Sequence, residues 1–164
     1  MKALTIRAPW WWYIFHGGLA RKNIENRSWA TQHRGPLLIH AATRFRPAEV
    51  QDDLDRAHRI AHRAARRAGL PRPPMPSFEQ LQEGCGRLVG QVIVTDCRPL
   101  AAIPARSRSP WLEGPFGWML DDPHAFAAPI PWRGALGLFV VPDHVLCRGP
   151  RSDARSALPG EASR

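Results

Sequence analysis

Proline and glycine divide this chain into short segments. Its 164 residues include 17 prolines and 13 glycines, spread along most of the length. Proline removes a backbone hydrogen-bond donor and glycine weakens a helix interior, so most regular elements have to fit between these residues. Apolar residues still make up 44% of the chain, which is ordinary for a globular protein. The sequence therefore predicts a single folded domain that needs no disulfide or metal for its stability.

Six short segments have the composition of β-strands. Near the N-terminus apolar and polar side chains alternate, which is the period of a half-buried strand. Gly90 lies inside one of the later segments and indicates a bulge there. The predicted strands are residues 3–7, 23–29, 37–40, 87–95, 116–120 and 135–141. Short strands joined by long irregular connections are typical of a compact β-barrel.

Two further segments predict helices. Pro9 suits the first turn of a short helix over residues 10–16, which Gly17 and Gly18 end. Residues 47–68 have apolar side chains at three- and four-residue spacing, which predicts a longer amphipathic helix. The polar side of the longer helix carries Arg56, Arg59, Arg63, Arg66 and Arg67. We interpret this arginine face as a solvated surface, with phosphate docking as the alternative.

The formal charge of +9 and the sequence pI of about 11.1 show an excess of basic residues. Such an excess favours polyanionic partners. An arginine-rich composition without a binding role accounts for the charge equally well, so charge alone does not decide. Residues 148–164 are polar and contain few large apolar side chains. They are predicted to be a disordered basic tail behind a domain of residues 1–147.

The cysteine pattern and the apolar N-terminal run indicate in which cellular compartment the protein is expected. No Cys-x-x-Cys or Cys/His cluster is present that would predict a metal site. The apolar run at residues 10–15 is too short to span a bilayer, and Arg7 and Pro9 interrupt any signal-peptide core. The protein is therefore predicted to be cytoplasmic, without membrane partner, cofactor or metal. Its three widely spaced cysteines are expected to be reduced: Cys85, Cys97 and Cys147.

A charged cluster in the second predicted strand is the main candidate for a site. On an extended backbone Glu25, Arg27 and Trp29 project to one face, and Lys22 directly precedes them. A guanidinium can hold a phosphate or a base edge, and a tryptophan can stack on a base. A surface salt-bridge ladder would have the same spacing, and spacing alone favours that interpretation.

Five blocks stand in order along the chain: LTIRAPW, KNIENRSW, RGPLLIHA, GPFGWML and RGALGLF, at residues 4–10, 22–29, 34–41, 114–120 and 133–139. Together they resemble the ASCH family of the PUA-like superfamily. The resemblance covers most of the chain up to Pro142. It implies an α+β fold: a PUA-like β-barrel with a cleft, a short N-terminal helix and one longer inserted amphipathic helix.

The family's motif is Gly-x-Lys-x-x-Glu-x-Arg. Lys22, Glu25 and Arg27 match its last three fixed positions, whereas Ala20 stands where the family has glycine. The loop before Lys22 therefore departs from the family pattern. The resemblance implies that the cleft binds RNA, other single-stranded nucleic acid or a modified nucleoside.

Catalysis is the alternative function. Some family members are reported as ribonucleases, and a related branch hydrolyses acetylated cytidine with lysine and threonine at the positions of Lys22 and Glu25. A metal-independent hydrolase of either kind would use Lys22 as base or nucleophile and Glu25 to move a proton. That mechanism weakens where Glu25 holds Lys22 in an ion pair. A third alternative is a protein-interaction adaptor that uses the arginine face of the long helix.

Several further residues are candidates for the cleft. Trp10 belongs to a matched block and is expected either to stack on a ligand or to pack in the core. His40 ends a predicted strand, and Arg7 could hold a phosphate or Glu25. Trp111 is expected to be an exposed stacking residue or part of a hydrophobic lid. The predicted binding residues are Arg7, Trp10, Lys22, Glu25, Arg27, Trp29 and His40.

Overall fold

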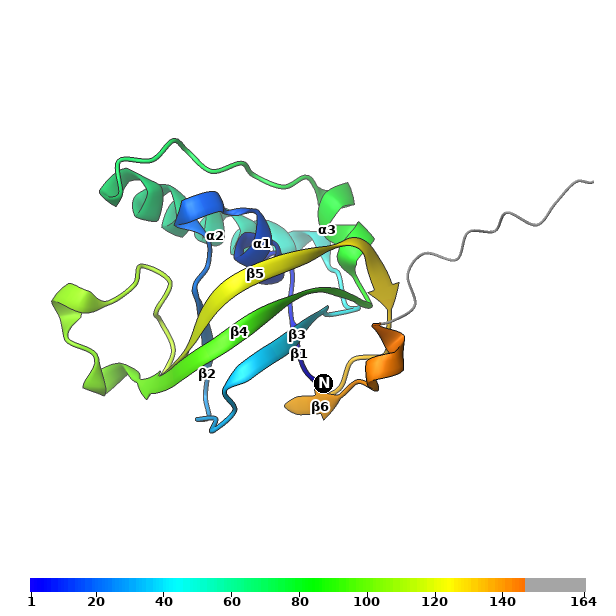
Figure 1. The fold of residues 1–164 in the computed structure, drawn as a ribbon. Helices are drawn as coiled ribbons and strands as arrows, with labels where there is room; N and C mark the ends of the chain where they lie inside the picture. Colours follow the sequence, from blue (N-terminus) through cyan, green and yellow to red (C-terminus); the bar gives the residue numbers. More distant parts are fainter. Residues whose placement is uncertain (147–164) are drawn as a thin grey trace, which may run out of the picture.

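A computed structural model describes residues 1–146, so the predicted tail and Cys147 lie outside the described residues. Within this part of the chain the fold is mixed α+β. A six-stranded sheet in the order β2-β5-β4-β3-β1-β6 curls into a half-barrel that is consistent with a PUA-like barrel (Figure 1). The strands are β1 (Lys2–Ile6), β2 (Ile24–Arg27), β3 (Gly35–Ala41), β4 (Arg87–Pro99), β5 (Phe116–Pro131) and β6 (Leu138–Val140). The helices are α1 (Trp10–His16), α2 (Pro47–Arg67) and α3 (Phe78–Gly84).

The helices gather on one side of the sheet (Figure 1). Helix α1 lies next to α2 and also contacts β3 and β5. It buries four consecutive side chains from Trp11 to Ile14, so more than one face of the helix is covered, while His16 at its end is exposed. β3 is buried from Leu37 to Ala41, between β4 and the parallel strand β1. None of the helices in residues 1–146 is long and apolar enough to cross a bilayer.

The bulge predicted at Gly90 is confirmed. The pairing of β4 with β5 shifts register between Leu88 and Gly90. A Cβ at residue 90 would lie 2.5 Å from the carbonyl oxygen of His124 and 2.6 Å from the ring of Phe15. Glycine is therefore required here because another strand and a helix side chain approach the backbone closely.

β5 continues eleven residues beyond the predicted segment, to Pro131. The sequence indicated a shorter strand because Pro123 and Pro129 follow it. β2 pairs with β5 from Phe116 to Met119, so beyond that point β5 has a neighbour on the β4 side alone. Proline is tolerated on such a free edge because no partner strand needs its missing N–H.

The longer helix begins at Pro47, as predicted, and ends at Arg67. Helix α3 was not predicted. Its N-terminus has a capping box, in which the Ser77 hydroxyl accepts from the Gln80 N–H and the Gln80 side chain accepts from the Ser77 N–H. The Ser-x-x-Gln spacing is the sequence signal that could have identified this helix.

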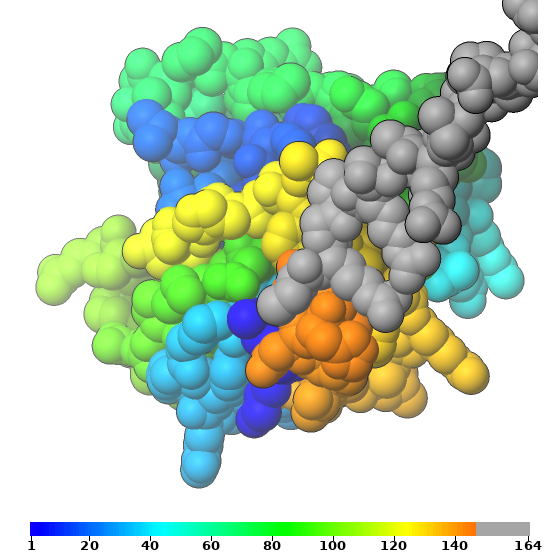
Figure 2. All heavy atoms as spheres, turned by 45° about the vertical axis from the view of Figure 1, so that its right-hand side comes forward, coloured from blue at the N-terminus to red at the C-terminus, as the bar shows by residue number. Residues whose placement is uncertain are grey.

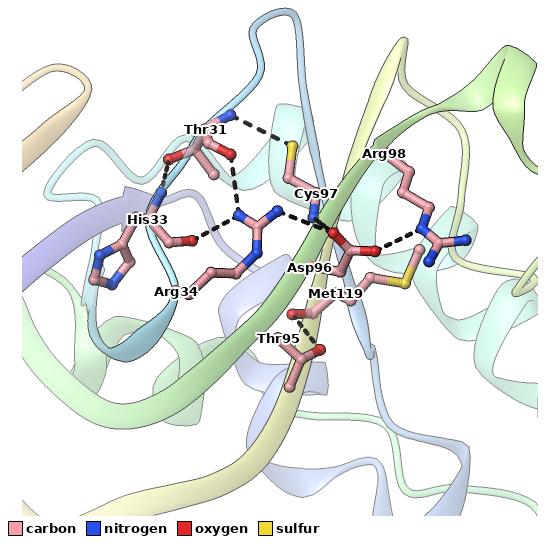
Figure 3. A network of polar contacts seen from close by, with 8 residues as sticks. All are labelled: Thr31, His33, Arg34, Thr95, Asp96, Cys97, Arg98 and Met119. Atoms are coloured by element: carbon pink, nitrogen blue, oxygen red, sulfur yellow. Dashed lines mark hydrogen bonds and ion pairs between the residues drawn. The ribbon is translucent and has the colours of Figure 1, made fainter.

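The loop between β2 and β3 is fastened to β4 (Figure 3). The Thr31 N–H donates to Cys97 Sγ at 3.4 Å, and Arg34 Nη2 donates to Asp96 Oδ1 at 2.9 Å. Arg98 donates to the other oxygen of the same carboxylate. Both cysteines in the described part of the chain, Cys85 and Cys97, are free thiols. These contacts fix the direction of the chain directly after β2.

A buried histidine makes the stability of this fold depend on pH. The Nδ1 of His58 in α2 lies 3.1 Å from the Tyr13 hydroxyl, and its Nε2 accepts from Arg72 Nε at 3.0 Å. Burial, aided by Arg72, lowers the pKa of His58 below its ordinary 6.5, and burial likewise lowers the pKa of His40. The unfolded chain therefore binds more protons than the folded chain below about pH 6.5.

We expect the free energy of unfolding to fall as the pH drops from about 6.5 towards 5.5, because protonation favours the unfolded chain. Urea denaturation at a series of pH values measures this slope. His58→Gln should flatten it relative to the wild type. A wild-type stability that stays constant between pH 7.5 and 5.5 would contradict the prediction.

Candidate functional site

A cleft of about 460 Å³ lies where β1 ends and β2 runs past it. In the sheet order β2 is one edge, and β1 lies next to the other edge. β6 pairs with β1 only at Lys2–Leu4, so Thr5 and Ile6 at the end of β1 have β3 on one side and, within the described chain, no paired strand on the other. The cleft is lined by Thr5, Ile6, Arg7, Trp10, Lys22, Glu25, Asn26, Arg27, Asp53, Arg56, Glu113 and Gly114.

The three motif residues form one buried ion cluster. Lys22 Nζ donates to Glu25 Oε2 at 2.5 Å and to the Ile24 carbonyl at 2.5 Å. Arg27 Nη2 lies 3.0 Å from Glu25 Oε1. The side chains of Lys22 and Glu25 are 3% and 8% exposed, and that of Arg27 is 23% exposed. The carboxylate is thus clamped between two cations, as the salt-bridge interpretation predicted, but inside a cleft and not on an open surface.

Arg27 also joins the two sides of the cleft. Its Nη2 donates to the Thr5 carbonyl of β1 at 2.8 Å. Its Nε is buried and has no hydrogen-bond partner among residues 1–146. A buried donor without a partner is costly unless something accepts from it. The contacts with Glu25 and Thr5 both use Nη2, so the other guanidinium nitrogens have no hydrogen-bond partner in the described part of the chain.

The outer wall of the cleft carries further ion pairs. Arg7 lies 3.6 Å from Asp53 of α2, and Arg56 of α2 lies 3.1 Å from Glu113. Together with the Lys22–Glu25–Arg27 cluster, these pairs give the lining four cations and three carboxylates. Because each carboxylate faces a cation, the cleft is close to neutral. It is polar and mixed in charge, unlike a site built for several phosphates.

The segment that carries Glu113 is held in place by Asn26 of β2. The Asn26 Oδ1 accepts from the N–H groups of Glu113 and Gly114 at 2.9 and 3.0 Å, and its Nδ2 donates to the Trp111 carbonyl at 2.8 Å. A Cβ at residue 114 would come within 2.9 Å of the Asn26 Cβ. Asn26 thus positions one wall of the cleft, although in β2 it alternates with Glu25 and Arg27.

The loop ahead of Lys22 is well fixed even though Ala20 replaces the family glycine. Residues Gly18–Ala20 form a short 3₁₀ turn. The Ala20 carbonyl accepts from the indole N–H of Trp111 at 3.2 Å, and the Lys22 N–H donates to the Tyr13 carbonyl at 2.8 Å. These bonds present the Lys22 side chain to Glu25.

Two predicted binding residues lie elsewhere. β2 ends at Arg27, and the chain bends at residues 28–29, so the alternation that put Trp29 on the face of Glu25 stops before it. Trp29 packs edge-on against Trp118, with ring centroids 4.7 Å apart, and does not line the cleft. His40 is buried, with its ring nitrogens near Thr5 Oγ1 and the Trp132 carbonyl.

Trp10 and Trp111, the other two tryptophans considered as ligand contacts, lie in different surroundings. Trp10, the first residue of α1, is half-buried and lines the cleft. Trp111 is 2% exposed and packs near Tyr13, with ring centroids 5.7 Å apart. The expectation of an exposed stacking residue or lid at Trp111 is wrong, because the indole fills the core beneath its loop. Loops 71–76 and 99–110 contribute no lining residue to the cleft.

A model of the ASCH domain matches residues 4–113, which include every lining residue of the cleft except Gly114. The chain belongs to the ASCH domain family. ASCH domains are PUA-like domains that are generally linked to RNA binding. No curated protein matches the chain.

Sequence reasoning missed the cleft residues that come from distant segments. Asp53 and Arg56 lie in α2, and Glu113 lies in the loop before β5. Helical spacing marked Arg56 only as part of the arginine face, and no local pattern marks Asp53 or Glu113, because their place in the cleft depends on how α2 and this loop pack beside the ASCH motif. Within residues 1–146 no group of three or more His, Cys, Asp or Glu side chains is arranged to hold a metal ion.

Proposed function

We propose that this ASCH protein binds RNA by taking the base of one unpaired nucleotide into the cleft. The observation that carries the proposal is the combination of a half-buried Trp10 with the Glu25–Arg27 pair in one near-neutral cleft. A nucleobase is uncharged and flat and has donors and acceptors on its edge. It therefore matches an aromatic wall beside polar groups better than a phosphate does. The volume of about 460 Å³ lies in the range of small-ligand sites.

Each residue has a role in this proposal. Trp10 stacks on the face of the base. Arg27 donates to the base edge through Nη1, because its contacts with Glu25 and Thr5 both use Nη2. Glu25 aligns the guanidinium, since it accepts from Arg27 and Lys22 together. Arg7, which lines the cleft with an exposed side chain and lies 3.6 Å from Asp53, contacts a phosphate of the nucleotide.

The contacts of Lys22 do not favour the hydrolase alternative. A general base or nucleophile needs a free lone pair directed at the substrate. Lys22 Nζ instead donates to the Glu25 carboxylate and the Ile24 carbonyl. We therefore propose a structural role for this lysine in the binding cleft.

Trp10→Ala should weaken binding of a single-stranded RNA by about 1–3 kcal/mol, because a stacking surface is lost. Fluorescence anisotropy with a labelled RNA dodecamer of mixed sequence measures the effect. Trp29→Ala is the matched control, since it removes an indole outside the cleft and should leave affinity unchanged in the folded fraction. Equal losses in both variants, or none in either, would contradict base stacking in the cleft. Assays of RNA cleavage and of acetylcytidine deacylation on the same samples should show no turnover.

A further inference from the structure

Five arginines form a continuous row along the exposed side of α2. Spacings of three and four residues place side chains on the same side of a helix. The members follow this spacing, and all five are exposed. The arginine row consists of Arg56, Arg59, Arg63, Arg66 and Arg67. In Figure 2 the C-terminal half of α2 and the segment after it form the green upper edge of the molecule, above the blue α1.

Most of the positive charge of the arginine row is not paired with a carboxylate. The acidic residues of α2 all lie in its first half, at Glu49, Asp52, Asp53 and Asp55. Within residues 1–146 Arg56 pairs with Glu113, whereas the other four members of the row form no ion pair. The arginines near the start of the helix are arranged differently, since Arg44 and Arg46 both contact Glu49.

Stabilisation of the helix by its dipole explains the last two arginines of the row but not the others. Cations in the last turn are stabilised by the helix dipole, and Arg66 and Arg67 lie there. That effect is confined to the last turn. Arg59 and Arg63 lie before it, and within residues 1–146 neither forms an ion pair.

The row starts in the cleft. Arg56 is one of the lining residues, and from Arg56 to Arg67 the helix advances about 16 Å at 1.5 Å per residue. Stacked nucleotides advance about 3.4 Å along one strand, so this distance covers several phosphates. A strand that leaves the cleft beside Arg56 can therefore follow the row.

We propose that the arginine row binds the phosphates of nucleotides adjacent to the one in the cleft. The inference rests on the proposed function and specifies its ligand: a single-stranded RNA chain, and not a free nucleoside or nucleotide. The near-neutral cleft contributes base contacts, and the row contributes sequence-independent electrostatic attraction. The two surfaces together bind a polymer more tightly than either binds alone.

The test compares two double variants that each remove two exposed arginine charges. Arg59→Gln/Arg63→Gln alters the row. Arg87→Gln/Arg106→Gln is the matched control, because both residues are exposed, lie outside α2 and form no ion pair within residues 1–146. Affinity for an RNA dodecamer is measured between 25 and about 200 mM salt. Affinity for the four nucleoside 5′-monophosphates is measured alongside.

The row variant should bind the dodecamer about tenfold more weakly at low salt. Its slope of log affinity against log salt should fall by about 1.4, since each lost phosphate contact contributes about 0.7 for a single strand. Mononucleotide affinity should stay at the wild-type value, and the control should keep the wild-type slope. Equal slopes in both double variants would overturn the proposal, because net charge alone would then account for binding. Equal competition by polyglutamate and RNA at matched charge would also overturn it, in favour of a general polyanion surface.

Failure of the proposed function has a different signature. If Trp10→Ala binds the dodecamer and the mononucleotides as the wild type does, the cleft is not the base site. A row variant with a lower slope in that case would show phosphate binding without the cleft, and would overturn the combined mode described above.

Discussion

Replacement of Glu25 by alanine is expected to lower the free energy of unfolding by about 3–5 kcal/mol. The variant leaves the Lys22 ammonium, 3% exposed, beside Arg27 with no carboxylate between them. Two cations then repel each other at a site that water reaches poorly. Breaking a buried ion pair by removing one partner is costly for this reason. Chemical denaturation monitored by tryptophan fluorescence measures the loss.

A matched control is available in the same chain. Glu49 also contacts two arginines, Arg44 and Arg46, but its side chain is 49% exposed. Glu49→Ala should therefore shift the denaturation midpoint far less than Glu25→Ala, since solvent screens the exposed pair. Lys22→Met combined with Glu25→Gln should recover much of the stability, because no unpaired buried lysine remains. Similar midpoints for the two alanine variants would show that the Glu25 cluster is not buried as described.

Trp111→Ala should destabilise the fold by about 3–5 kcal/mol, the usual cost of truncating a buried tryptophan. The indole is 2% exposed, lies near the ring of Tyr13, and donates to the Ala20 carbonyl at 3.2 Å. Its loss opens a cavity and leaves that carbonyl without its donor. Small domains have about 5–15 kcal/mol in total, so a large share of the stability depends on this side chain.

Trp111→Phe separates the two contributions. The phenyl ring fills much of the cavity but cannot donate, so the loss should be smaller than for alanine and should include about 1 kcal/mol from the missing hydrogen bond. Thermal unfolding of the three proteins checks the order wild type, phenylalanine, alanine. A fully stable Trp111→Ala would instead support the exposed position that the sequence suggested.

Local patterns identified most strands and the core of the site. Alternation located β1 and β2, and the ASCH motif located Lys22, Glu25 and Arg27. The prediction for Trp29 failed because alternation holds only while a strand continues, and β2 ends at Arg27. The end of a strand depends on which neighbour it pairs with, and that information is not local.

Long-range packing decided the remaining features. Trp111 stands in a loop rich in serine and proline, which suggested exposure, but the loop folds back over α1 and Ala20. The carboxylates that neutralise the cleft, Asp53 and Glu113, come from segments 60 residues apart in the chain. The sequence could show a basic protein with a charged motif, whereas the near neutrality of the cleft required the folded structure.

At the junction between β1 and β2 the half-barrel is held by a side chain and not by paired strands. A barrel closed by a ladder of backbone hydrogen bonds can widen only if several bonds break together. Here one side chain spans the gap, through the bond from Arg27 Nη2 to the Thr5 carbonyl. A change in the Arg27 rotamer breaks this bond and the contact between the same Nη2 and Glu25 Oε1, while the pairing of β1 with β3 and of β2 with β5 does not depend on it. The width of the opening between β1 and β2 thus depends on one arginine side chain, which also holds the Glu25 carboxylate.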